Sequence, residues 1–179
     1  MWNFNLMVTL AVDGRFYTLL RELSLHGEFH KNEYYGTILG QVPDPLAFLE
    51  MIRSRRQDAP HAFAGLGRII PFEHSFLFTP DTFLPRLQAA LTPYAERLFG
   101  LSFYVRLERR GLKGRIISPE IERALDAFLL NLVHNGGGTA QIDFADPDTI
   151  FAIETFGERG GIGLLTRPLR ERYPFVHVP

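Results

Sequence analysis

The strongest constraint on the fold of this chain is a repeated switch between two periods of apolar residues in its first half. Strand-like runs with apolar side chains at every second position alternate with runs at helical spacing, at residues 4–10, 16–23, 29–42 with two strands, 45–52 and 63–70. Asp44 before Pro45 is the expected start of the second helix, because aspartate can cap free backbone N–H groups and proline fits the first turn. The resulting order β-α-β-β-α-β predicts a ferredoxin-like unit in residues 1–78.

The pattern starts again near Thr79 and predicts a second domain over residues 79–179. Its expected elements are a helix broken by prolines at 79–98, a strand at 103–109, a helix at 118–135, strands at 139–144 and 149–155 joined across a turn, and a strand at 162–165. Ser118 is the expected N-cap of the second helix, whose apolar stripe lies opposite polar residues that include Glu122 and Asp126. The two halves together predict a mixed α+β protein of two domains.

The composition excludes several classes of protein. With 179 residues and 46% hydrophobic content, the chain is long enough to bury one large core or two small ones. Because it contains no cysteine, disulfides, cysteine-ligated metal sites and a thiol nucleophile are excluded. The first residues lack the basic start of a signal peptide, and no run approaches the roughly 20 apolar residues of a membrane span. We therefore expect a cytoplasmic protein without a membrane partner.

Positive charge is concentrated around the end of the strand at residues 103–109, although the formal net charge of the chain is −1. The cations are Arg106 within the strand and Arg109, Arg110, Lys113 and Arg115 beyond it. Two glycines in the same stretch allow the backbone to bend. One interpretation is a solvated surface loop, because arginine is mostly exposed in any protein. The other interpretation is an edge that binds phosphate groups.

Four segments of the second half, FYVRLERRG, ISPEIERALDAFL, IDFADPDTIFAIET and GIGLLTR, span Phe103 to Arg167. In order and spacing they resemble the THUMP domain, an RNA-binding module of tRNA-modifying enzymes. The asparagine-proline step of that family is here Asp146-Pro147, which adds a negative charge near the turn. The first half is similar to the ferredoxin-like domain that precedes THUMP, and the layout is similar to stand-alone THUMP proteins related to the tRNA cytidine-acetylation adaptor.

The resemblance implies a protein that binds tRNA near its acceptor end and serves as an adaptor for a separate tRNA-modification enzyme. It implies RNA contacts at positively charged residues of the strand, the loop and the last strand, namely Arg106, Arg109, Arg110, Lys113, Arg115 and Arg167. Arginine suits this role because its planar fork can donate two hydrogen bonds to one phosphate. The arginines of residues 53–56 and 170–172 are explained instead by the dipole of a helix end and by a C-terminal tail.

We expect no catalytic residue, no cofactor and no metal site. The six histidines lack the spacing of metal ligands, and Asp143, Asp146 and Asp148 are explained by turn chemistry. Gly160 and Gly161 indicate either a hairpin turn or a close approach to an RNA backbone. Two other functions remain open: a small tRNA-modifying enzyme with a site between the domains, and a protein-interaction module whose cations bind an acidic partner.

Overall fold

The computed structural model describes residues 3–179, which divide into two compact units. One unit comprises the chain up to Glu73 together with Pro168–Pro179, and the other comprises His74–Arg167. This division differs from the predicted boundary near residue 78 at two points. The residues after Glu73 already form a strand of the second sheet. The C-terminal segment returns to the first unit, where the backbone N–H of Ile69 donates to the carbonyl of Phe175 at 2.8 Å.

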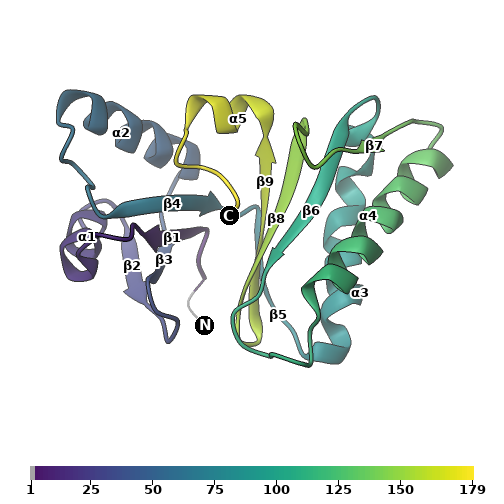
Figure 1. Ribbon diagram of the computed structural model, residues 1–179, viewed down its shortest axis with the longest axis horizontal. Helices are drawn as coiled ribbons and strands as arrows, with labels where there is room; N and C mark the ends of the chain where they lie inside the picture. Colours follow the sequence, from purple (N-terminus) through teal and green to yellow (C-terminus); the bar gives the residue numbers. More distant parts are fainter. Residues whose placement is uncertain (1–2) are drawn as a thin grey trace. The chain divides into compact units, whose positions relative to one another are not determined.

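The first unit has the predicted order of elements. These are β1 (Leu6–Leu10), α1 (Phe16–Leu23), β2 (Glu28–Lys31), β3 (Thr37–Gln41), α2 (Pro45–Asp58) and β4 (Leu66–Pro71). The sheet order is β2-β3-β1-β4 and the neighbouring strands are antiparallel, which is compatible with a ferredoxin-like unit (Figure 1). The predicted N-cap is confirmed, since the Asp44 side chain accepts a hydrogen bond from the backbone N–H of Ala47 at 3.0 Å.

One glycine of this sheet makes room for an aromatic contact. Gly40 on β3 lies opposite Phe29 on β2, and a Cβ added at Gly40 would meet the Phe29 ring at 2.2 Å. The same ring packs against Phe48 of α2, with centroids 5.5 Å apart. The missing side chain at Gly40 therefore lets β2 and α2 pack together over the same part of the sheet.

The second unit is built on a five-stranded sheet, with two helices lying together on one face (Figure 1). Its elements are β5 (His74–Leu77), α3 (Pro80–Leu91), the 3-10 helix η1 (Thr92–Leu98), β6 (Ser102–Glu108), α4 (Ser118–Asn135), β7 (Gln141–Ile142), β8 (Thr149–Phe156) and β9 (Arg159–Thr166). The short helix α5 (Arg167–Arg172) follows, and all of it except its first residue belongs to the first unit. The strand order is β5-β9-β8-β6-β7, with β6 parallel to β7 and β8 and the other pairs antiparallel. The predicted mixed α+β fold is confirmed.

The helices of the second unit follow the sequence pattern except at one end. The proline-rich stretch forms α3, with Pro85 inside it, and continues as a 3-10 helix from Thr92, so the predicted break is confirmed. Ser118 is the first residue of α4, and the N-cap is Ile117. The carbonyl of Ile117 accepts from the N–H groups of Glu120 and Ile121. Within residues 3–179, no helix is long and apolar enough to cross a membrane.

The strands of this unit differ from expectation at two glycines, and their order is not that of the chain. The runs at 139–144 and 149–155 are joined by a turn but are not neighbours, because β6 lies between β7 and β8. Gly160 and Gly161 lie within β9 and not in the turn before it, and the Phe76 ring of β5 covers Gly160. Both glycines are buried, so neither offers a backbone to a ligand.

Two carboxylates of α4 complete the hydrogen bonding of β6. β7 pairs only with the first two residues of β6. The N–H groups of Val105 and Leu107, on the same edge of β6, therefore lie past the end of β7. The Asp126 carboxylate accepts from the N–H of Val105 at 2.9 Å, and Glu122 accepts from the N–H of Leu107 at 2.7 Å. Asp126 is only 8% exposed, so the expectation that it lies on the polar face is wrong. Burial raises its pKa to about 6.

Candidate nucleic-acid interface

β6 carries the predicted cations to one end of the second sheet. It runs parallel to β8, with Phe103 opposite Thr149 and Glu108 opposite Glu154. The segment of residues 109–117, here called the cation loop, therefore lies at the C-terminal ends of both strands and leads into α4. The alternating pattern of β6 places buried side chains on the helix-covered face, so the loop begins from a well-packed strand.

The cation loop forms a tight turn that two apolar side chains hold in place. Gly111 and Gly114 have positive φ angles of 83° and 80°, which glycine adopts without strain, and Leu112 between them has a φ of 51°. The carbonyl of Leu112 accepts from the N–H groups of Arg115 and Ile116 at 3.0 and 3.1 Å. The Leu112 side chain packs against the core of the second unit, and Ile116 is buried in it. The residues between these two anchors are left facing outward.

Lys113 and Arg115 are the exposed cations of this loop. In the part of the chain that the structure describes, neither side chain has a hydrogen-bond or ion-pair partner. Their donors are therefore available to a ligand such as a phosphate. The N-terminus of α4 follows directly and attracts anions through its dipole, although Glu120 in its first turn opposes that attraction.

Arg106 and Arg109 are partly engaged within the protein. The guanidinium of Arg106 lies between two carboxylates, with Nη2 3.6 Å from Glu108 and Nη1 4.0 Å from Glu122. Arg109 donates from Nη1 to the carbonyl of Gly111. Because that carbonyl carries no net charge, Arg109 keeps its positive charge for an anion, whereas the charge of Arg106 is offset at the distances of its two partners.

Arg110 is anchored to the sheet. Its Nη1 forms an ion pair with Glu154 of β8, a carboxylate that is only 1% exposed, and its guanidinium lies 5.4 Å from the centroid of the Phe156 ring. Its N–H donates to Thr155 Oγ1 at 3.1 Å, and its carbonyl accepts from the N–H of Gly157 at 2.9 Å. These contacts join the cation loop to β8, so an RNA contact by Arg110 would compete with a structural role.

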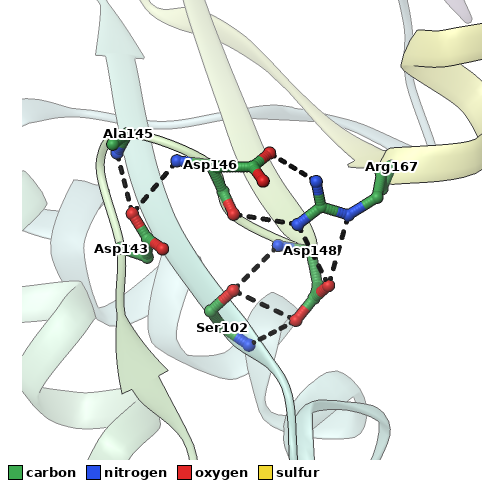
Figure 2. A network of polar contacts seen from close by, with 6 residues as sticks. All are labelled: Ser102, Asp143, Ala145, Asp146, Asp148 and Arg167. Atoms are coloured by element: carbon green, nitrogen blue, oxygen red, sulfur yellow. Dashed lines mark hydrogen bonds and ion pairs between the residues drawn. The ribbon is translucent and has the colours of Figure 1, made fainter.

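Arg167 lies in a network of aspartates (Figure 2). It is the first residue of α5, one position beyond the strand it was expected to end. Its guanidinium pairs with Asp146, donates to the Asp146 carbonyl at 2.9 Å and lies 3.3 Å from Asp148. The predicted turn role of Asp143 is confirmed, because its carboxylate accepts two backbone N–H groups of the turn. Hydrogen bonds from the N–H and hydroxyl of Ser102 hold the pKa of Asp148 below its usual value, so it stays ionised opposite Arg167.

The six predicted residues fall into two groups at opposite ends of the sheet. Thr166, directly before Arg167, pairs with Thr149 at the start of β8, whereas the cation loop lies at the end of β8. At about 3.3 Å per residue, the two groups are roughly 20 Å apart. Arg159 is not among the six predicted residues, although it pairs with Phe156 and so lies at the cation-loop end. A sequence pattern cannot reveal which strand ends meet.

The Arg167 end of the sheet carries an aromatic pair. Phe144 is 71% exposed, and its ring centroid is 5.3 Å from that of Tyr104. An exposed ring of this kind can stack on an unpaired base. Within residues 3–179, no group of three histidine, aspartate or glutamate side chains could hold a metal ion.

No protein-family model and no curated protein matches this chain. Its fold nevertheless matches solved structures. PH1313 from Pyrococcus horikoshii has a TM-score of 0.63 and 14% sequence identity, over 91% of this chain and 54% of that one. TrmN from Thermus thermophilus has a TM-score of 0.59 and 21% identity, over 94% of this chain and 48% of that one.

A third solved structure is a 4-thiouridine synthetase–RNA complex with bound ATP, with a TM-score of 0.61 and 14% identity over 91% of this chain and 41% of that one. This chain thus spans about half the length of the solved structures it resembles. At these identities the likeness establishes the fold, a mixed α+β arrangement of two sheets.

Proposed function

We propose that this protein binds RNA through the cation loop, with Lys113 and Arg115 as the principal phosphate contacts. The observation that carries the proposal is that these two cations are exposed, without side-chain partners among the described residues, on a loop held by Leu112 and Ile116. A loop that is already ordered loses little conformational freedom on binding. Contacts to phosphates position a nucleic acid without reading its sequence, which suits a protein that recognises RNA shape.

The kind of RNA is inferred from a resemblance. The THUMP-like segments of the second unit support tRNA bound near its acceptor end, and a fold shared with a 4-thiouridine synthetase solved as an RNA complex supports RNA as the ligand. In this proposal the protein is a non-catalytic adaptor. It holds the tRNA while a separate tRNA-modification enzyme acts on it.

The test is binding of the purified full chain to total tRNA over a salt series, measured by filter binding. The variant Lys113→Glu, Arg115→Glu should bind more weakly, and its slope of log K against log salt should be smaller in magnitude by about 2, since each lost phosphate contact removes close to one released counterion. Arg86→Glu, Arg97→Glu is the matched control, because it makes the same charge change at exposed positions of α3 and η1. Charge reversal at Arg110 is unsuitable, because it would replace a cation that pairs with the buried Glu154 carboxylate by a second negative charge.

Equal weakening in both double variants would refute the cation loop as the contact surface. Turnover of tRNA by the purified protein with an acetyl or methyl donor would favour a small tRNA-modifying enzyme instead. Binding of an acidic protein together with no binding of tRNA would favour a protein-interaction module.

A further inference from the structure

A second group of arginines surrounds a cavity of about 490 Å³ in the first unit. The cavity is lined by α2, β4 and the C-terminal segment, and its defining residues are Arg53, Arg56, Arg172, Leu66, Pro174 and Phe175. The sequence explained these arginines separately, by a helix end and by a tail. They meet because the C-terminal segment returns to β4, where the carbonyl of Phe175 accepts from the N–H of Ile69. The volume lies in the range of small-molecule sites.

Glu50 positions two of these arginines without cancelling their charge. Its carboxylate accepts hydrogen bonds from Arg53 Nη2 at 2.6 Å, from Arg172 Nε at 3.0 Å and from the Tyr173 hydroxyl at 2.9 Å. The hydrogen bond from Arg53, followed by those from Tyr173 and Arg172, lowers the pKa of Glu50 to about 2. Three guanidinium groups and one carboxylate leave two positive charges in excess around the cavity.

Arg56 is the cavity arginine that is not committed elsewhere. Arg53 and Arg172 share Glu50, whereas the side chain of Arg56 has no ion-pair or hydrogen-bond partner within residues 3–179. The lining also includes the buried side chains of Leu66 and Phe175. The cavity is therefore lined by both cationic and apolar side chains, and such a lining fits a ligand that combines an anion with an apolar body.

We propose that this cavity binds the terminal phosphate of a nucleotide, with the guanidinium groups on the phosphate and the nucleoside against the apolar part of the lining. A phosphate monoester carries about −1.5 to −2 at pH 7, which matches the excess of positive charge better than an internal phosphodiester does. Arginine suits the site because its planar fork fits phosphate oxygens. A free nucleoside monophosphate and the 5′-phosphorylated end of an RNA offer the same chemistry, and the second source rests on the proposed RNA-binding function.

The test compares Arg56→Gln with Arg55→Gln in the full-length protein. Both residues lie in the last turn of α2 and lose the same charge, but Arg55 is exposed and does not line the cavity. The probes are AMP, by calorimetry, and one RNA hairpin carrying either a 5′-phosphate or a 5′-hydroxyl. Arg56→Gln should weaken the phosphorylated probe by about tenfold or more, because a charge-assisted hydrogen bond is lost, and Arg55→Gln should not.

The outcomes separate the source of the phosphate and separate this inference from the proposed function. AMP binding that Arg56→Gln weakens supports a free nucleotide, and a 5′-phosphate preference without AMP binding supports an RNA end. Equal binding of both hairpins without AMP binding overturns the cavity site but leaves RNA binding by the cation loop standing. AMP binding without RNA binding supports the cavity and refutes the proposed function. Equal effects of the Arg55 and Arg56 variants also overturn the cavity site.

Discussion

Replacing Asp126 by asparagine should make the folded protein more stable relative to the wild type as the pH rises from 4 to 7. Asp126 is 8% exposed on α4 and accepts a hydrogen bond from the N–H of Val105 at 2.9 Å. Burial raises its pKa from 3.8 to about 6, the hydrogen bond from Val105 opposes that rise, and the charge of Glu122 adds to it. Asparagine keeps an oxygen that can accept from Val105 but carries no charge for burial to disfavour.

The size and sign of the effect follow from the two pKa values of Asp126. The difference between 3.8 and about 6 corresponds to about 3 kcal/mol, at 1.36 kcal/mol for each pKa unit. Because the pKa is higher in the folded state, the folded protein binds the extra proton between pH 3.8 and 6. The contribution of Asp126 to stability is therefore fully present below pH 3.8 and is lost as the pH rises through 6.

Urea denaturation followed by circular dichroism at pH 4, 5, 6 and 7 measures this contribution as the difference between the variant and the wild type. The free energy of unfolding of Asp126→Asn minus that of the wild type should increase by about 2 to 3 kcal/mol as the pH is raised from 4 to 7. Glu120→Gln, at an exposed position of the same helix, is the control for the loss of a carboxylate charge without burial. A flat or falling difference for Asp126→Asn would refute the argument from burial.

Three further expectations follow from single contacts. Arg110→Met should lower the free energy of unfolding by about 3 kcal/mol in urea titrations, because it removes the cation that forms an ion pair with the buried Glu154 carboxylate. Gly40→Ala should cost about 1–3 kcal/mol by the same assay, since its Cβ would meet the ring on the neighbouring strand at 2.2 Å. Ser102→Ala should raise the pKa of Asp148 toward its usual value in an NMR titration, because the Ser102 hydroxyl is one of the groups that lower it.

The sequence predicts the elements of the fold better than their partners. Periodicity identified the strand that became β6 and the capped helix that became α2, because both patterns are local. It could not show that β6 separates β7 from β8, because the choice of a strand partner is a long-range event. β5 was missed, because its residues are mostly exposed and show no alternation of buried and exposed side chains.

The same limit applies to the candidate site. Arg110 and Lys113 look alike in the sequence, but Arg110 is held by Glu154, a residue 44 positions away in the chain. Asp126 fits the polar stripe of its helix and is nevertheless buried, because its carboxylate bonds to the backbone of β6 beyond the end of β7. The charge of a residue is visible in the sequence, whereas its partner depends on the sheet.

The availability of each cation, and not the number of cations, decides how strongly this protein can attract a phosphate chain. A guanidinium already paired with a carboxylate, such as Arg110 or Arg167, neutralises a phosphate less effectively and so displaces fewer of the counterions condensed on the RNA. If all six predicted residues contacted phosphates, the salt slope would approach about 5 in magnitude, whereas contacts by Lys113 and Arg115 alone give about 2. A formal net charge of −1 is therefore compatible with RNA binding, because carboxylates that lower the total, such as those of Asp146, Glu50 and Asp126, are bonded to other cations or to a backbone N–H group.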